Sequence, residues 1–481
     1  MKRKLGWFGL GFAGAELAAA NLPPLVCVPT AAFLALLAFW KRRRDARIPL
    51  LGALCGLAWF ALFTLIFVQP CRALAGQTVT CTAVVETDAE ASYSDSRLRG
   101  TLRLTEIDGK PARLRVQCSS FPGESAGERF EASFALSSLP DNRYRLSRNS
   151  KGVYLQAEYL GSYRGLAASK APRFALFRLR QRWSAVLRRW LPKRLDGMEA
   201  AMLLADKSHL EDAVQQAFRA AGVSHLLAVS GLHLALLCGL LGFGRRWRFY
   251  KPLILLRGAA ALFYLLLTGA PVSVLRAGLV LAVALAGEFL LQPVDLLTST
   301  GFAAVLMGLQ NAYAPCDIGF QLSFCAVLGV QAAAALTEAE RRAAAQGKSA
   351  ALRLVCRLAE PVQVAALASL ATLPVLVAHG MSTSLVGIVC NVLVVWMLQP
   401  ALQMGILLLI FSAVPFLLPL VNLTGLFGLR QCSESLSAVR HCRLRLSIYR
   451  SGTRCLCWRC WARWLYTTGM EKGCGCIRLL R

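Results

Sequence analysis

The sequence predicts a polytopic α-helical membrane protein with one small β-domain inserted in its first half. The 481-residue chain is 56% hydrophobic and its mean hydropathy is +0.50, which is too apolar for an ordinary soluble protein. Several apolar runs approach or exceed the ~18 residues that a bilayer-crossing helix needs. Residues 72–166 depart from this pattern, because there apolar and polar residues alternate over short stretches.

Charge and cysteine content limit the partners that the chain can have. The formal net charge is +28, and part of it belongs to basic loops that stay on the cytoplasmic side of a membrane. The excess suits an anionic partner, either phospholipid or nucleic acid. The 17 cysteines include no two C-x-x-C pairs at zinc spacing, and no Walker A motif is present. We therefore expect no metal, no cofactor and no ATP-driven motor in this chain.

Residues 1–70 hold the N-terminal membrane segments. Two short apolar runs, 5–20 and 25–40, are separated by Asn-Leu-Pro-Pro, which indicates a bend. Basic clusters flank the pair, so the two runs are expected to form a hairpin with both ends in the cytoplasm. A single crossing at 48–68 then places the following residues outside the cytoplasm.

Residues 71–166 are expected to form the β-domain. Strands are predicted at 78–85, at 128–136, at 152–160, and as a pair within 98–118 around a turn at Asp108-Gly109. About five short strands suit a small β-barrel, with an OB-like barrel as one option and a β-sandwich as the alternative. Cys81 and Cys118 lie in predicted strands and are expected to be close enough for a disulfide in an oxidising compartment, with Cys71 as a rival partner.

Residues 167–222 contain a basic amphipathic helix, expected at 169–195. Its aromatic and aliphatic residues recur at helical spacing, and its basic residues are accompanied by no acid between 173 and 194. Two interpretations stay open: a helix lying on lipid headgroups, or one that contacts a nucleic-acid backbone. The residues expected to bind DNA in the second case are Arg173, Arg178, Arg180, Arg182, Arg188 and Arg189.

Residues 223–430 form the main membrane domain. The predicted spans are 225–243, 253–270, 272–291, 296–311, 318–336, 362–379, 384–400 and 401–420. If residue 223 is outside, the basic loops at 244–251 and 341–357 both fall inside, as the positive-inside rule requires.

Several polar residues lie among these apolar runs, where they are costly unless they face the protein interior. Ser230 and His233 are three residues apart, which suits either the nucleophile and base of an intramembrane hydrolase or polar groups that pack helices together. Arg276 could pair with Asp317 or Glu288 in a structural ion pair, or could meet an anion in a polar path.

Three segments in order resemble one family, the ComEC competence proteins. They are FRAAGVSHLLAVSGLHLALL at 218–237, GAPVSVLRAGLVLA at 269–282 and DIGFQLSFCAVLGV at 317–330. NRYRLSRNSKGVYLQA at 142–157 is similar to the end of that family's soluble N-terminal domain. The resemblance covers residues 1–430.

The resemblance implies a multi-pass bacterial inner-membrane channel for single-stranded DNA, with an extracytoplasmic OB-like domain and no enzymatic activity of its own. A DNA receptor and a cytoplasmic DNA motor are the partners it implies, beside DNA and lipid. An intramembrane hydrolase and a transporter of small molecules or lipids are the alternatives. The residues expected to line or support the channel are His225, Ser230, Gly231, His233, Arg276, Asp317, Gln321 and Ser323.

Residues 431–481 form an atypical tail rich in Arg, Cys and Trp. A frameshifted reading frame is the favoured explanation, and a genuine basic, cysteine-rich cytoplasmic tail is the other. Many members of the family carry a metallo-β-lactamase-like nuclease domain after the channel, and we expect this chain to lack it.

Overall fold

The computed structural model describes residues 3–22, 44–86, 90–91, 98–119, 121, 126–142, 144–169, 171–227, 229–241, 251–346, 350–381, 400, 402–409 and 412. The chain divides into two compact units. The first holds 1–208, 229–320 and 405–415, and the second holds 209–228, 321–404 and 416–481. The run expected at 25–40, most of the spans at 384–400 and 401–420, and the tail 431–481 lie outside the described residues.

A five-stranded β-barrel belongs to the first unit. The strands are ordered β1-β5-β6-β4-β3, and β3 also pairs with β1, so the ring closes. All neighbouring pairs are antiparallel except β4 with β6. A short β2 (Glu90–Ala91) pairs antiparallel with the start of β3, and α5 (Arg145–Asn149) precedes β6. The barrel strands are β1 (Thr78–Val85), β3 (Leu98–Ile107), β4 (Lys110–Ser119), β5 (Arg129–Ser138) and β6 (Val153–Leu166). The closed ring confirms the predicted small barrel and excludes the sandwich.

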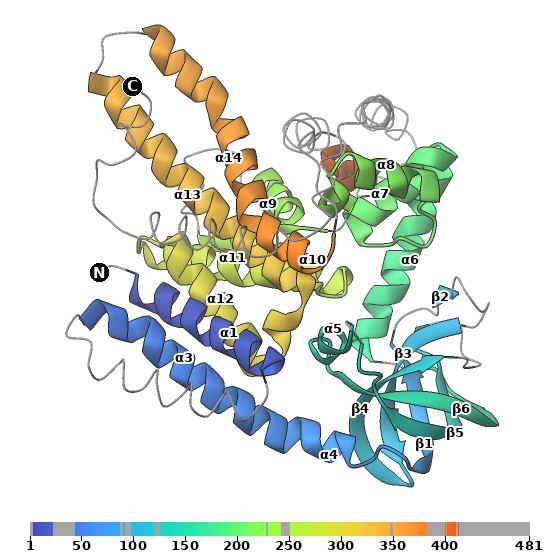
Figure 1. Ribbon diagram of the computed structural model, residues 1–481. Helices are drawn as coiled ribbons and strands as arrows, with labels where there is room; N and C mark the ends of the chain where they lie inside the picture. Colours follow the sequence, from blue (N-terminus) through green and yellow to red (C-terminus); the bar gives the residue numbers. More distant parts are fainter. Residues whose placement is uncertain are drawn as a thin grey trace. The chain divides into compact units, whose positions relative to one another are not determined.

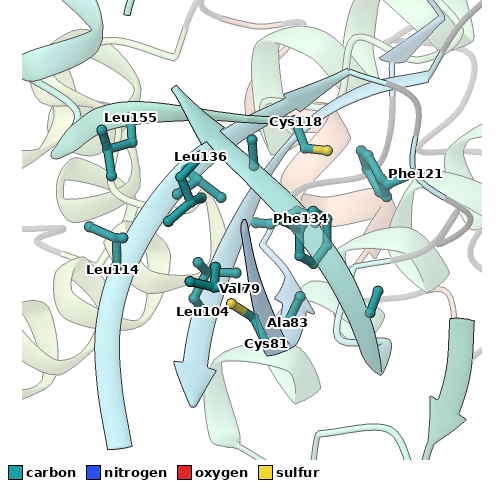
Figure 2. Packing of buried hydrophobic residues seen from close by; sticks show 14 of the residues in the cluster. Val79, Cys81, Ala83, Leu104, Leu114, Cys118, Phe121, Phe134, Leu136 and Leu155 are labelled. Atoms are coloured by element: carbon teal, nitrogen blue, oxygen red, sulfur yellow. The ribbon is translucent and has the colours of Figure 1, made fainter. Parts of the chain in front are cut away.

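The barrel interior is filled by apolar side chains from every strand of the ring (Figure 2). Phe130 and Phe134 are fully buried at its centre, with ring centroids 6.3 Å apart. The predicted turn between β3 and β4 is present: Asp108 and Gly109 both have positive φ, at 47° and 76°, as a two-residue hairpin turn requires. The Asp108 carboxylate also accepts a hydrogen bond from the Thr80 backbone N–H at 3.0 Å.

The predicted disulfide between Cys81 and Cys118 is wrong. Both residues are buried free thiols in the barrel core. Cys81 stands opposite Ile107 of β3, whereas Cys118 stands opposite Gly100 of the same strand. Seven strand positions correspond to about 23 Å at ~3.3 Å per residue, and a disulfide needs Cα atoms within ~7 Å. The two thiols therefore fill separate layers of the core, as Figure 2 shows.

Three helices of the first unit pack at backbone contact. α1 (Lys4–Asn21) lies between α3 (Arg44–Phe63) and α12 (Leu296–Gln310) (Figure 1). A Cβ atom at Gly9 would meet the carbonyl of Gly301, and one at Gly52 would meet the carbonyl of Phe8. Only glycine permits this approach, which is a common way of packing apolar helices without a hydrophobic driving force. A π-helical stretch (Thr64–Val68) and α4 (Gln69–Arg72) continue α3 toward the barrel.

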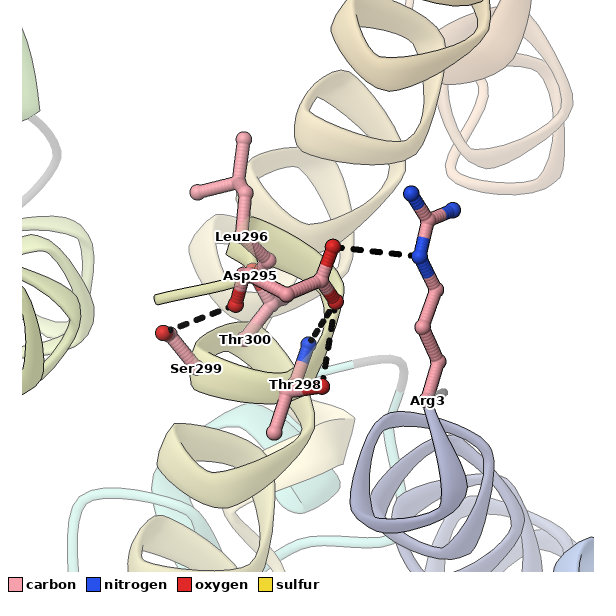
Figure 3. A network of polar contacts seen from close by, with 6 residues as sticks. All are labelled: Arg3, Asp295, Leu296, Thr298, Ser299 and Thr300. Atoms are coloured by element: carbon pink, nitrogen blue, oxygen red, sulfur yellow. Dashed lines mark hydrogen bonds and ion pairs between the residues drawn. The ribbon is translucent and has the colours of Figure 1, made fainter. Parts of the chain in front are cut away.

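A polar network joins the start of α1 to the start of α12 (Figure 3). Arg3 Nε lies 3.1 Å from Asp295 Oδ1, and Asp295 Oδ2 accepts hydrogen bonds from the backbone and hydroxyl of Thr298, each at 3.0 Å. Asp295 is thus the N-cap of α12, a position worth ~1 kcal/mol. Because both starts adjoin, α1 and α12 run in the same direction.

Asn311 connects the barrel to the end of α12. Its amide nitrogen donates to the carbonyls of Asn149 and Ser150, both at 2.9 Å, at the end of α5. The side-chain oxygen Oδ1 of Asn311 accepts a hydrogen bond from the backbone N–H of Tyr313 at 3.0 Å. The barrel therefore lies at the end of α12 that is opposite the Arg3–Asp295 network.

The remaining helices complete the two units. The first unit also contains α6 (Pro172–Trp190), α7 (Lys193–Leu204), α9 (Gly231–Leu240), α10 (Lys251–Leu267) and α11 (Val272–Leu290). The second contains α8 (Asp212–Ala220), a 3₁₀ turn (Ser224–Leu227), α14 (Ala350–Ala378) and all but the first turn of α13 (Ile318–Gln346).

Four helices in the described part of the chain are long and apolar enough to cross a membrane. They are Arg47–Arg72, Val272–Leu290, Ile318–Ala339 and Ala359–Ala378, which match the predicted spans at 48–68, 272–291, 318–336 and 362–379. The span predicted at 225–243 is interrupted in the described residues: the chain makes a 3₁₀ turn at Ser224–Leu227, and the ten-residue α9 begins only after Ser230. α10 and α12 are apolar but short, at 17 and 15 residues.

Candidate functional site

Ser230 and His233 form the start of α9. Ser230 is the N-cap residue, and its backbone N–H donates to His233 Nδ1 at 3.0 Å. The Ser230 hydroxyl lies 3.0 Å from the same ring nitrogen. His233 is 3% exposed, so the imidazole is a buried group that satisfies the backbone at a helix terminus.

This geometry favours a structural role over a hydrolytic one. In a Ser-His pair, the histidine nitrogen that faces the serine hydroxyl must accept its proton, and a third group orients the ring through the other nitrogen. Here Nδ1 already accepts the Ser230 backbone N–H. The His233 Nε2 atom is buried and makes no hydrogen bond within the described residues. The orienting member of a catalytic triad is therefore missing from that part of the chain.

Gly231 brings the start of α9 against α11. A Cβ atom at Gly231 would lie 2.9 Å from Ala277 Cβ and 4.0 Å from Arg276 Nη2. The first of these distances is shorter than carbon atoms tolerate, so the close approach depends on glycine. The structure thus places Gly231, between Ser230 and His233 on α9, beside Arg276, and the assignment of these residues to one functional site stays a prediction.

Asp317 begins α13 on the same part of the first unit. Its Oδ1 accepts a hydrogen bond from the Phe320 backbone N–H at 3.0 Å, the bond of an N-cap residue. A Cβ atom at Gly319 would lie 3.9 Å from Ser273 Oγ, which is one turn before Arg276 on α11. The first turns of α11 and α13 are therefore neighbours.

The start of α9 therefore packs beside Arg276, and the start of α13 packs beside Ser273, both within the first two turns of α11. We name this group of Ser230, Gly231, His233, Arg276 and Asp317 the helix-start cluster. Each helix start carries a partial positive charge of about +0.5 from its aligned peptide dipoles, and Arg276 adds a full charge. The arrangement suits attraction of an anion more than it suits proton or acyl transfer.

The other predicted channel residues belong to the second unit. His225 is exposed on the 3₁₀ turn, and Gln321 and Ser323 are half-buried on α13. Gln321 Oε1 lies 3.0 Å from His379 Nε2 at the end of α14, a partner that the sequence pattern did not indicate. Their placement in a common path with Arg276 stays a prediction. Glu288, a suggested partner of Arg276, pairs instead with Arg257 at 2.9 Å.

The predicted basic helix is α6, and its two faces differ as expected. Phe174, Ser184 and Leu187 are buried. Trp183 packs edge-on against Phe263 of α10, with ring centroids 6.1 Å apart, so part of the apolar face is occupied by the protein rather than left for lipid. Five of the six predicted arginines are exposed and Arg180 is half-buried. The exposed ones are Arg173, Arg178, Arg182, Arg188 and Arg189.

Arg180 relates α6 to the helix-start cluster. Its Nη1 would lie 4.0 Å from a Cβ atom at Gly269, in the turn between α10 and α11. Gly269 and Ala270 have positive φ, at 78° and 52°, and Pro271 then caps α11. The basic helix therefore reaches the turn that precedes Ser273 and Arg276.

Comparison with known proteins identifies the family. The model of the competence protein family matches residues 202–461, more than half of the chain. The chain belongs to the competence protein family. The match extends 31 residues past the end expected at 430, into the segment interpreted as atypical.

One curated relative is ComE operon protein 3 of Bacillus subtilis (strain 168), which is 32% identical over 234 residues. The matched region covers 46% of this chain and 28% of that relative, so this chain corresponds to less than a third of its length. No solved structure matches. Within the described residues, no group of three or more His, Cys, Asp or Glu side chains could hold a metal ion.

Proposed function

We propose that this chain forms part of a bacterial inner-membrane channel that takes up single-stranded DNA. Membership of the competence family implies a role in DNA uptake. The observation that supports the channel role is that the starts of α9 and α13 both pack against the first two turns of α11, which carry Arg276. A polar, cationic group inside an apolar helical bundle suits a path for a polyanion.

The contacts also support a consistent orientation. Asn311 holds the barrel at the end of α12, and Asp317 begins α13 six residues later. The helix-start cluster would then face the same side of the membrane as the barrel. By the positive-inside rule, we expect that side to be the extracytoplasmic side of the membrane. The strand order of the barrel, with its single parallel pair, agrees with an OB-like fold, a fold that often binds single strands.

The basic helix α6 is the proposed DNA contact outside the bundle. Its exposed arginines would contact DNA phosphates, and Arg180 would contact the DNA next to the turn at Gly269. DNA binding by the purified full chain should weaken steeply with salt. Arg182→Gln should reduce the slope of log K against log salt by ~0.7, the value for one lost phosphate contact on a single strand. Arg164→Gln on the barrel is the matched control, since Arg164 is an exposed arginine that lies on β6 and not on α6.

The deciding experiment is DNA uptake by a full-length relative that carries Arg276→Gln at the matching position. We expect uptake to fall about tenfold or more, as loss of a charge-assisted contact worth ~1.5–3 kcal/mol implies, while membrane abundance stays normal. Arg276→Lys, which keeps the charge, should retain part of the uptake. Normal uptake in Arg276→Gln would show that the residue is structural and that the path lies elsewhere.

Two further measurements separate the alternatives. A reporter fused after residue 169 should behave as translocated, and cytoplasmic behaviour there would overturn the orientation. A fluorophosphonate probe should leave Ser230 unlabelled, because His233 is engaged as a helix cap. Labelling at Ser230 would favour the hydrolase instead.

A further inference from the structure

A cavity of about 370 Å³ lies where the barrel meets the membrane helices of the first unit. One wall is a column on the helix that runs from Arg47 to Arg72, made of Trp59, Phe63, Phe67 and Cys71, each one turn after the last. The opposite wall comes from the barrel, and the end of α12 closes one side. The volume is within the ~300–1,000 Å³ range of small-molecule sites.

The barrel wall of this cavity is cationic. Arg103, Arg113 and Arg115 line it, and among the described residues no acidic side chain does. Arg103 and Arg115 both pair with Glu86, the second through its Nε at 2.8 Å. Glu86 also pairs with Arg173 of α6 at 3.2 Å, so three arginines share this one carboxylate and the mouth stays positively charged. Arg113 is exposed and has no ion-pair partner within the described residues, so its guanidinium is available to an anion.

The helix wall is apolar and reaches into the depth of the membrane. Residues 48–71 contain no charged side chain, and 24 helical residues measure about 36 Å against a hydrocarbon layer of ~30 Å. Trp59 is 13 residues before Arg72, which places it about 20 Å below that charged end. Phe67, which lines the cavity, is 50% exposed. The cavity is therefore cationic at the level of the membrane surface and aromatic below it.

We propose that this cavity binds an anionic phospholipid. The arginines would contact the phosphate diester and the polar headgroup, and the aromatic column would contact the upper part of an acyl chain. A nucleotide offers the same phosphate chemistry, but its polar base would have to enter the layer occupied by Trp59 and Phe63, where unsatisfied polar groups are costly. An amphiphile matches both halves of the cavity at once.

The bound lipid would fasten the barrel to the bilayer surface. It would contact β3 and β4 through their arginines and the continuous Arg47–Arg72 helix through its aromatic column. This role concerns barrel placement and is independent of what the bundle transports.

The test uses the purified full chain in nanodiscs made of equal amounts of phosphatidylglycerol and phosphatidylcholine. Native mass spectrometry then measures which lipid remains after release from the disc. We expect retention of phosphatidylglycerol, and about tenfold less retention in Arg113→Gln, since a charge-assisted contact is worth ~1.5 kcal/mol or more. Arg164→Gln is the matched control, because Arg164 is an exposed barrel arginine that does not line the cavity.

Four outcomes would overturn the proposal. They are equal retention of both lipids, equal retention by Arg113→Gln and wild type, displacement of the lipid by inorganic phosphate at matched concentration, and displacement by oligothymidylate with the same dependence on Arg113. The third would indicate a site for a free anion and the fourth a DNA site. Because lipid retention does not require transport, failure here leaves the proposed channel unaffected.

Discussion

The barrel and the helix-start cluster bury very different groups. The barrel core consists of apolar side chains and two thiols, and its polar backbone is satisfied by a closed ring of strands. The cluster instead buries His233 and Asp317 and holds Arg276 half-buried between helices. The barrel is therefore stabilised mainly by transfer of apolar area out of water. The cluster depends instead on hydrogen bonds at helix starts and on the close approach of helix backbones.

This difference indicates where each kind of substitution should act. A change in the barrel should alter the free energy of unfolding of that domain. A conservative change in the cluster should leave the fold in place and alter local order or transport. Three substitutions and one change of pH test the comparison.

The largest effect is expected for Phe134→Ala in the barrel core. Phe134 is fully buried, and loss of its ring should lower the free energy of unfolding by ~3–5 kcal/mol. Leu160→Ala on β6, where the side chain is 55% exposed, is the control and should change it little. Protease resistance of the barrel in the full chain measures both. Equal resistance in the two variants would contradict a barrel held together by its core.

Gly231→Leu should cost ~1–3 kcal/mol through steric conflict with Ala277. Gly239 lies on the same helix and has open space around it, so Gly239→Leu is a matched control that should be tolerated. Abundance in the membrane after expression at equal levels is the measurement. If both variants accumulate normally, α9 does not rest on α11 as described.

Alkaline pH should destabilise the barrel through its two thiols. Burial raises the pKa of Cys81 and the pKa of Cys118 to about 12 each, and the nearby charges of Asp108 and Glu158 add to this effect of desolvation. Below an ordinary thiol pKa of ~8.5, both the folded and the unfolded chain keep these protons, so no stability difference arises. As the pH rises further, the unfolded chain ionises first and the folded state loses up to ~1.4 kcal/mol per pH unit and thiol.

Unfolding of the full chain followed between about pH 8 and pH 10.5 checks this dependence, and Cys118→Ala should make it shallower. Alkylation of Cys81 and Cys118 at about pH 8 should be slow in the folded protein and fast after denaturation. Rapid alkylation of both thiols in the folded protein would show that the barrel interior is open to solvent.

The smallest effect is expected at Asp317. Its carboxylate caps α13, so Asp317→Ala should cost ~1 kcal/mol, and Asp317→Asn, which keeps the acceptor oxygen, should cost less. Hydrogen exchange of the first turn of α13 is the measurement, with faster exchange expected in the alanine variant. An equal loss of protection in both variants would mean that the charge of Asp317 matters more than its cap.

The sequence by itself determined the order of the elements and the character of each. Alternation of apolar residues predicted all five barrel strands, and the Asp108-Gly109 pair predicted the turn between two of them, because both are local properties of the chain. Long uncharged runs likewise predicted the four long apolar helices. The family signature led to Ser230, Gly231, His233, Arg276 and Asp317.

Only the tertiary structure decided which of these residues meet and what their side chains do. The spacing of Ser230 and His233 suits both a hydrolase pair and a pair of polar residues that pack helices together. The hydrogen bond from the Ser230 backbone N–H to His233 Nδ1 makes them a helix cap. Strand register, set by pairing between distant segments, separated Cys81 from Cys118. No local signal marked Asn311 as the contact between barrel and helix, because a hydrogen bond across about 160 residues of chain depends on how the two elements pack.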